Sequence, residues 1–299
     1  METRTTGVYR ERAERRRRTR GEGEARGDGW QRTEQDERLL RLATRYSTLT
    51  LHQAAYACWG GQIEAARRRV RLMAEAGLLH RSADVRWART IVWPTLRGAR
   101  IAGTGLSAPK PPGERLLHRL AVADTGITLE ANGYTVLSER EVHAAEAVPG
   151  RATEILEALR VPGVPTGARR GEMLAVTVGA HAVHWPDLVV VEPVPRFPIA
   201  VEVELTPKPA ATLRTILRAY RQAHRRVVYM ATEPVARQLQ GRPGPDGRWV
   251  DGLAQDVGLL PGGEPRRASG GHLHVRPFTT VDPAVRRRAE LQAARLRGG

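Results

Sequence analysis

The sequence predicts an α/β (α+β) protein in which a small helical part ending in a β-hairpin precedes a larger part with a mixed central sheet. Two observations lead to this prediction. Residues 33–76 carry apolar residues at helical spacing, and two short apolar runs around a turn follow them. From about residue 173, runs rich in β-branched residues alternate with helical segments, which is typical of an α/β layer.

The composition narrows the class of protein. The chain has 299 residues, 48 Lys and Arg against 32 Asp and Glu, a net charge of +16 and a pI near 11.2. A pI well above about 9 is typical of nucleic-acid-binding proteins. The sequence lacks a membrane span and a signal peptide, so a cytoplasmic, nucleoid-associated protein with no membrane partner is expected. Cys58, the single cysteine, excludes an intrachain disulfide.

Missing motifs exclude several enzyme classes. The chain has no Gly-Lys pair and therefore no phosphate-binding loop of the P-loop NTPases. It also has no Gly-x-Ser-x-Gly elbow of the kind that hydrolases use.

The composition also divides the chain into five segments. Residues 1–32 are rich in arginine and poor in apolar residues, which predicts a disordered basic arm. This arm either contacts DNA phosphates or only keeps the chain soluble. The other segments are a winged-helix DNA-binding domain at 33–102, a Pro/Gly linker at 103–113, a larger mixed domain at 114–281 and a basic helical tail at 282–299.

The first domain takes its name from its order of elements. Helices are expected from Thr33, at 51–58 and at 62–76, and hairpin strands at 78–80 and 90–93. This is the order of a winged helix–turn–helix, whose third helix enters the major groove while the hairpin, or wing, lies along the backbone. The basic residues of the third helix and wing are Arg67, Arg68, Arg69, Arg71, Arg81, Arg86 and Arg89. They predict binding to double-stranded DNA; the alternative is a solvated basic helix.

The larger domain is predicted from its alternating pattern. Helices are expected at 114–131, 210–224 and 235–239, and again from residue 283. The expected strands lie at 173–178, 187–191, 199–205, 227–230 and 272–275.

Three acidic residues of this domain form a candidate metal site. If a hairpin is centred near residue 195, Asp187 lies across the ladder from Glu202 and Glu204, which share one face of their strand. Clustered carboxylates repel one another unless a cation lies between them, and Mg²⁺ prefers such oxygen ligands. The alternative is a half-buried strand with an acidic outer face, although Glu is depleted in strands.

These residues resemble a known group of nucleases. Pro186-Asp187, Glu202-x-Glu204 and Lys208 resemble the PD-(D/E)xK superfamily, and the combination with an N-terminal winged helix resembles the bacterial replication-relaxation family. The resemblance covers about residues 33–240. The similar segments are 76–79, 118–120, 138–140, 185–187 and 201–208, and Tyr220 follows the last of them.

The resemblance implies roles for several residues. Asp187 and Glu202 would hold Mg²⁺, and Glu139, expected before the first strand, would be the superfamily's early glutamate. Glu204 stands where the superfamily usually has lysine, so Glu204 or Lys208 would orient or deprotonate a water. The implied function is DNA binding in the replication or relaxation of a plasmid or conjugative element, with Mg²⁺-dependent nicking and with replication or conjugation proteins as partners. The alternative is a non-catalytic regulator or replication accessory factor.

Two further observations bear on chemistry. Lys208 is one of only two lysines in a chain with 46 arginines. Either the function of this position requires a compact ammonium group, or the lysine reflects chance in codon usage. His272-Leu273-His274 resembles the His-hydrophobe-His pattern of relaxases, for which Tyr220 or Tyr229 would be the nucleophile. A surface pair of histidines on a late strand is the alternative.

Overall fold

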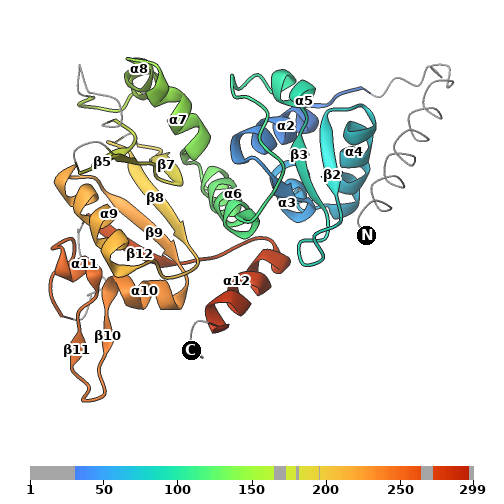
Figure 1. Ribbon diagram of the computed structural model, residues 1–299. Coiled ribbons are helices and arrows are strands. Elements are labelled where there is room, and N and C mark those ends of the chain that lie inside the picture. The colour runs from blue at the N-terminus through green and yellow to red at the C-terminus, as the bar shows by residue number, and fades with distance from the viewer. Residues whose placement is uncertain (1–30, 165–172, 180–181, 195, 264–271, 296–299) are drawn as a thin grey trace, which may run out of the picture. The chain divides into compact units, whose positions relative to one another are not determined.

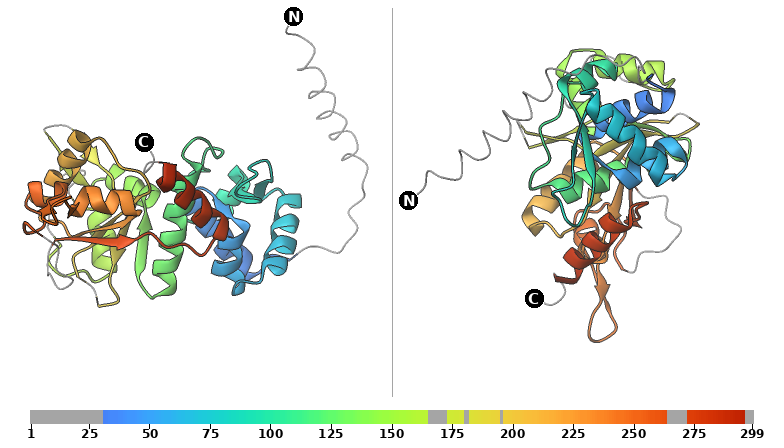
Figure 2. Two further views of the ribbon diagram at one scale, coloured as in Figure 1. Left: turned by 90° about the horizontal axis from the view of Figure 1, so that it is seen from below. Right: turned by 90° about the vertical axis from the view of Figure 1, so that its right-hand side faces the viewer.

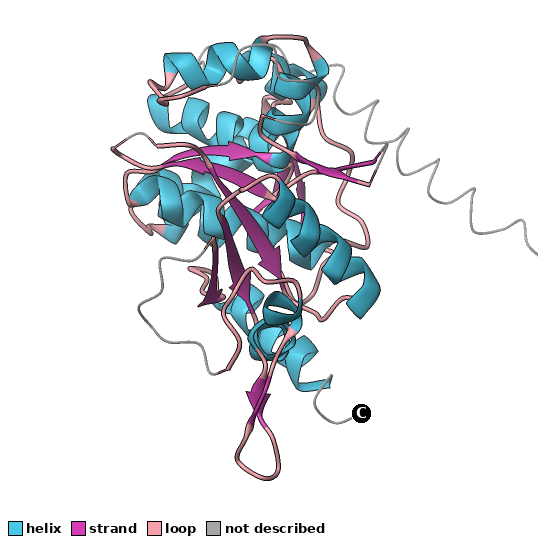
Figure 3. Cartoon of the chain, turned by 90° about the vertical axis from the view of Figure 1, so that its left-hand side faces the viewer, coloured by secondary structure: helices cyan, strands magenta, loops and turns pink. Residues whose placement is uncertain are grey.

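The computed structural model describes residues 31–164, 173–179, 182–194, 196–263 and 272–295. Their helices and strands confirm the expected mixture of α and β structure, with a mixed five-stranded sheet (Figures 1 and 3). Almost all of the predicted 1–32 arm lies outside these residues. Residues 34–299 form one compact unit.

The N-terminal part contains three helices and a small antiparallel sheet. The elements are α2 (Glu34–Tyr46), β1 (Leu49–Thr50), α3 (Leu51–Trp59), α4 (Ile63–Glu75), β2 (Leu79–Ser82) and β3 (Ile91–Pro94), and the sheet order is β1-β3-β2. The apolar face expected for α4 is its buried face, with Ala66, Val70 and Met73 inside. Thr50 caps α3 and forms a capping box with Gln53, which explains the break between the first two helices.

Helix α6 (Leu116–Ala131) lies between this part and the main sheet (Figure 1). It contacts α2, α3 and β1 on one side and strands β4 and β8 on the other. The short helix α5 (Leu96–Ile101) and the irregular segment 103–115 lead into it.

The main sheet has the strand order β12-β9-β8-β7-β4. Its strands are β4 (Thr135–Ser138), β7 (Leu188–Val191), β8 (Ile199–Glu204), β9 (Val227–Ala231) and β12 (Leu273–Pro277). Strands β4, β7 and β8 pair antiparallel, whereas β8, β9 and β12 pair parallel. Helix α9 (Ala210–Gln222) makes the crossover from β8 to β9 that a parallel pair requires.

Helices cover both faces of this sheet. Ala200 of β8 and Tyr229 of β9 face a core formed with α9, α10 (Glu233–Gln240) and α11 (Leu253–Asp256). Val203 faces the other way, toward α6 and the C-terminal helix α12 (Pro283–Arg295). The alternative of a half-buried strand with an acidic outer face is therefore wrong for β8, because all six of its residues are buried.

The remaining elements lie around the sheet. They are α7 (Glu139–Ala147), α8 (Arg151–Ala158), the hairpin β5 (Val176–Val178) and β6 (Ala182–His184), and the hairpin β10 (Arg242–Pro243) and β11 (Trp249–Val250). Helices α7 and α8 pack on Val189 and Val191 of β7. Figure 2 shows two further views of this arrangement.

A buried polar network holds the C-terminal segment against α3 and α6. The Asp124 carboxylate of α6 accepts hydrogen bonds from Gln53 Nε2 at 3.1 Å, from the Val281 backbone at 3.0 Å and from the Thr280 hydroxyl. The Thr50 hydroxyl donates to Asp282, which also accepts from the Ala284 backbone at the start of α12. These bonds fix the start of α12 beside α3.

Helices α2 and α6 approach closely at Gly126. A Cβ at this position would collide with the Tyr46 ring, whose hydroxyl donates to Glu130 Oε1 at 3.0 Å and so resists displacement. We expect Gly126→Ala to lower the free energy of unfolding by about 2 kcal/mol, because overpacking outweighs the gain in helix propensity. Chemical denaturation of the variant measures this loss.

Gly113→Ala is the matched control, because a Cβ at Gly113 meets open space. Its effect is expected to stay within about 0.5 kcal/mol. Equal stability of the two variants would contradict this account of the α2–α6 contact.

Candidate functional site

The three acidic residues come together at one end of β7 and β8. In the β7–β8 register Leu188 pairs with Val201, so Asp187, one position earlier, lies opposite Glu202. The centre of this hairpin is therefore where the sequence places it. Glu202 and Glu204 share the face of β8 that looks toward α9.

Both oxygens of Asp187 have partners in the protein. His118 Nε2 of α6 lies 3.0 Å from Oδ1, and the Val203 backbone N–H donates to Oδ2 at 2.8 Å. Burial alone would raise the pKa of Asp187, but the His118 contact and the backbone hydrogen bond lower it below the ordinary value. Asp187 is therefore an ionised carboxylate.

Glu202 is the most deeply buried of the three. His184 Nε2 of β6 lies 2.7 Å from its Oε1, and the Tyr220 hydroxyl of α9 donates to the same oxygen. Burial raises the pKa of Tyr220 well above its ordinary value, and the Glu202 charge adds to this rise. Tyr220 therefore acts here as a neutral hydrogen-bond donor.

Glu204 forms an ion pair with Lys208, four residues further along the chain. Burial raises the pKa of Glu204 above its ordinary value, although the Lys208 ammonium opposes the rise. Burial would lower the pKa of Lys208, but Glu202 and Glu204 together raise it. Lys208 thus serves both glutamates as a counter-ion.

The cluster is close to electrically balanced. Three carboxylates are offset by the Lys208 ammonium and by two imidazoles, His118 and His184. Burial would lower the pKa of each histidine, but the neighbouring Asp187 or Glu202 carboxylate raises it above the ordinary 6.5. Among the described residues, no group of three or more His, Cys, Asp or Glu is arranged to hold a metal ion.

Asp187 and Glu202 nevertheless suit Mg²⁺ in their chemistry. Both present oxygen donors, and the pKa of Asp187 lies on the ionised side of its ordinary value. The contacts described for Glu202 use only Oε1.

The structure corrects the placement of Glu139. Strand β4 ends at Ser138, so Glu139 follows the first strand and begins α7. Its backbone N–H donates to the Asp187 carbonyl at 3.0 Å, but its side chain is exposed and lies 3.8 Å from His143. Strand β4 was not expected from the sequence because only two of its residues, Val136 and Leu137, are apolar.

The arginines of α4 have different surroundings. Arg67, Arg68 and Arg71 are exposed, with Arg67 beside Glu64. Arg69 instead donates through Nε to the fully buried Asp36 at 3.0 Å. Arg69 is therefore a structural residue that joins α4 to α2, and its assignment to DNA contact is not supported.

The wing residues Arg86 and Arg89 line a groove of about 640 Å³ between the β2–β3 loop and α12. Arg287 and Arg288 line its other side, and none of the described residues lining it is acidic. The Arg288 guanidinium lies 5.9 Å from the centre of the Trp87 ring, at cation–π distance. Arg81 is also exposed, on β2.

Sequence reasoning missed several residues of both regions. His118 reaches Asp187 from a helix 69 residues away in sequence, so no local pattern could reveal it; His184, the partner of Glu202, lies only three residues before Asp187, and that proximity was its only signal. Arg287 and Arg288 lay in the predicted basic tail, but nothing in the sequence placed that tail beside the wing.

The competing relaxase pattern finds little support in the geometry. His272 lies just before β12 and contacts His224, with ring centres 6.4 Å apart. Tyr220 and Tyr229 are both buried in the core with α9.

Burial also raises the pKa of the Cys58 thiol to about 12.

Comparison of the chain with protein-family models, with curated proteins and with solved structures finds no match. Within the described part of the chain, no helix has the length and apolar character to cross a membrane.

The two site histidines predict a pH dependence of stability. Because their pKa values are raised by folding, the stability they contribute is complete below pH 6.5 and is lost as the pH rises through the raised values. The melting temperature should therefore fall as the pH rises above 6.5, the ordinary histidine value. The double variant His118→Gln/His184→Gln should lose most of this decrease.

His80→Gln is the control, because His80 is an exposed residue of β2 far from the acidic cluster in the chain. It should keep the wild-type pH profile. An unchanged profile in the double variant would mean that neither histidine carries the charge assigned to it.

Proposed function

We propose that this chain binds double-stranded DNA and cleaves one strand at the acidic cluster, in the replication or relaxation of a plasmid or conjugative element. The groove between the wing and α12 carries the DNA-binding part of the proposal. Four arginines line it without any acidic residue among the described lining, and such an uncompensated surface attracts phosphates. Replication or conjugation proteins are the partners that the family resemblance suggests.

The order of elements supports the same proposal. The order α2, β1, α3, α4, β2, β3 is typical of a winged helix, in which α4 would enter the major groove and the β2–β3 loop would follow the DNA backbone. In the larger part, β4, β7, β8, α9 and β9 follow one another as expected for a PD-(D/E)xK core. Asp187 lies just before β7 and the two glutamates lie on β8, an arrangement that supports the resemblance.

The protein residues of the proposed reaction have distinct tasks. Glu204, whose pKa is raised by burial, is suited to accept a proton from the attacking water at its carboxylate. Lys208 holds that carboxylate in place and offers positive charge to the phosphate. His118 fixes Asp187, and Tyr220 with His184 fixes Glu202.

Asp187 and Glu202 would hold Mg²⁺. When bound, the metal would polarise the phosphate and lower the pKa of a bound water.

The alternative is a DNA-binding regulator or replication accessory factor without catalysis. The pairing of each carboxylate with a protein partner favours it, because a cluster balanced by Lys208, His118 and His184 holds together without a metal.

The DNA-binding proposal is tested at α12. Changing both Arg287 and Arg288 to Gln should weaken binding to duplex DNA about tenfold. It should also reduce the number of counterions released on binding by about two, which makes the affinity less dependent on salt. Fluorescence anisotropy at several salt concentrations measures both quantities. The matched control is Arg237→Gln/Arg248→Gln, which removes the same charge from exposed positions away from the groove. Equal affinities for the two double variants would contradict the groove assignment.

The cleavage proposal is tested by nicking of supercoiled plasmid with Mg²⁺ or with EDTA. The wild type should nick only with Mg²⁺, and Asp187→Asn should abolish nicking while leaving duplex binding unchanged. Lys208→Arg should reduce the rate at least about tenfold, because a planar guanidinium cannot replace a compact ammonium beside Glu204.

Asp246→Asn is the control, because Asp246 is exposed in the β10–β11 hairpin. Melting temperatures of all variants separate lost chemistry from lost folding. A wild type that binds duplex DNA but never nicks it would establish the non-catalytic alternative.

A further inference from the structure

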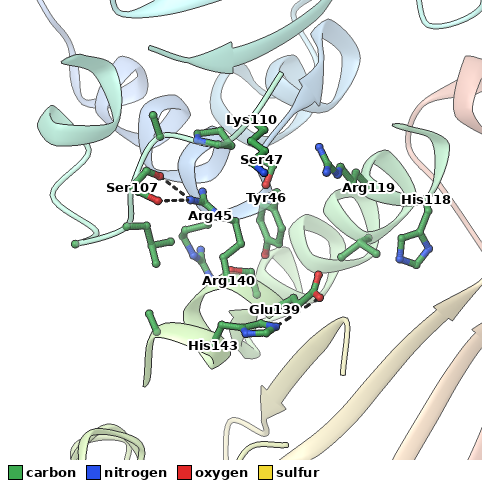
Figure 4. A pocket seen from close by; sticks show the side chains of 17 residues that line it. Arg45, Tyr46, Ser47, Ser107, Lys110, His118, Arg119, Glu139, Arg140 and His143 are labelled. Atoms are coloured by element: carbon green, nitrogen blue, oxygen red, sulfur yellow. Dashed lines mark hydrogen bonds and ion pairs between the residues drawn. The ribbon is translucent and has the colours of Figure 1, made fainter. Parts of the chain in front are cut away.

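A second basic pocket lies beside the acidic cluster. It has a volume of about 720 Å³ and is enclosed by the end of α2, the segment 105–110, α6 and the start of α7 (Figure 4). This volume is typical of sites for small molecules of nucleotide size. The described residues lining it include four cationic side chains, Arg45, Lys110, Arg119 and Arg140, and one carboxylate, Glu139.

Three of the four cations have no carboxylate partner among the residues that the structure describes. Arg45 is satisfied, because it forms ion pairs with Glu130 at 2.6 Å and Glu141 at 2.9 Å. Lys110, Arg119 and Arg140 form no ion pair with a carboxylate of the described residues. They come from three separate elements, so the fold and not one charged run gathers them in this pocket.

Arg140 holds the pocket wall in place. Its guanidinium donates to the Thr44 carbonyl of α2 and, at 2.6 Å, to the Ser107 carbonyl. These bonds fix the coil that carries Lys110 against α7. Burial lowers the pKa of Arg140, and the charge of Arg119 lowers it further, so the two guanidinium groups repel each other. A bound anion would relieve this repulsion.

The pocket adjoins the acidic cluster at two points. His118 lines the pocket, and its Nε2 lies 3.0 Å from Asp187 Oδ1. Glu139, another lining residue, donates its backbone N–H to the Asp187 carbonyl. His143 adds an aromatic ring to the lining and is held by stacking on Trp185, with ring centres 4.0 Å apart.

We propose that this pocket binds the phosphate groups of a DNA strand that leads into the acidic cluster, with Lys110 and Arg119 as the phosphate ligands. The inference rests on the proposed function and adds a second contact surface to it, separate from the groove at α12. A strand suits the pocket better than a lone anion, because the cations are spread over three elements and the pocket continues to Asp187 through His118. The proposal also gives a role to Lys110, the other of the two lysines of the chain, which lines this pocket.

The test measures binding of 5′-phosphorylated tetrathymidylate by isothermal titration calorimetry. Arg119→Gln and Lys110→Gln should each weaken binding about tenfold to a hundredfold, as expected for loss of a charge-assisted hydrogen bond. Arg248→Gln, which removes an exposed arginine of the β10–β11 hairpin, is the matched control and should bind as the wild type does. Arg140 is left unchanged because its bonds to two carbonyls are structural.

Two further probes identify the ligand chemistry. A tetrathymidylate with neutral methylphosphonate linkages and no terminal phosphate should fail to bind, and inorganic phosphate should bind more weakly than the charged oligonucleotide. Wild-type affinity in both pocket variants, tight binding of the neutral probe, or equal affinity for inorganic phosphate would overturn the proposal.

Duplex binding is measured in parallel so that the two proposals fail separately. The pocket variants should retain the wild-type affinity for duplex DNA, which depends on α4, the wing and α12. If the wild type binds the oligonucleotide but not duplex DNA, the proposed function is overturned while the proposal for the pocket holds.

Discussion

The buried carboxylate of Asp124 fixes the arrangement on which both candidate surfaces depend. It lies in α6 and accepts hydrogen bonds from Gln53 of α3 and from Thr280 and Val281 ahead of α12. Asp124 is fully buried, and this burial raises its pKa above the ordinary value despite these donors. A buried polar group is costly unless its partners are in place, so these segments can pack in few other ways. The groove that Arg287 and Arg288 share with the wing follows directly from this constraint.

Helix α6 also positions residues of the acidic cluster and of the second basic pocket. Its first two turns present His118 to Asp187 and Arg119 to the second basic pocket, while Ala121 packs beneath Val203 of β8. One rigid element therefore sets the positions of the C-terminal helix, the acidic cluster and the pocket. Its close approach to α2 at Gly126, together with the ion pairs of Arg45, ties these positions to the N-terminal helices.

Much of the fold could be predicted from sequence because most elements have strong local patterns. Helices α3, α4, α6 and α9 and strands β7, β8 and β9 begin and end within a few residues of the expected positions. Strand β1 was missed because it has only two residues, and β4 was missed because only two of its four residues, Val136 and Leu137, are apolar. The pairing of Asp187 with Glu202 was predictable from hairpin symmetry. The partners His118, His184 and Tyr220 were not, because tertiary packing alone brings them to the carboxylates.

The acidic cluster is compensated by its own neighbours although the chain as a whole is strongly basic. In a chain with a net charge of +16, three carboxylates at one end of a sheet stand out, yet each has its own donor or cation. An external cation must therefore compete with Lys208 and with two imidazoles whose charge is lost as the pH rises. Deprotonation of His118 and His184 leaves the carboxylates with less compensating charge and raises their attraction for a metal. In the proposed Mg²⁺ site, metal binding would therefore strengthen over the same pH range in which the two histidines lose their protons and their contribution to stability.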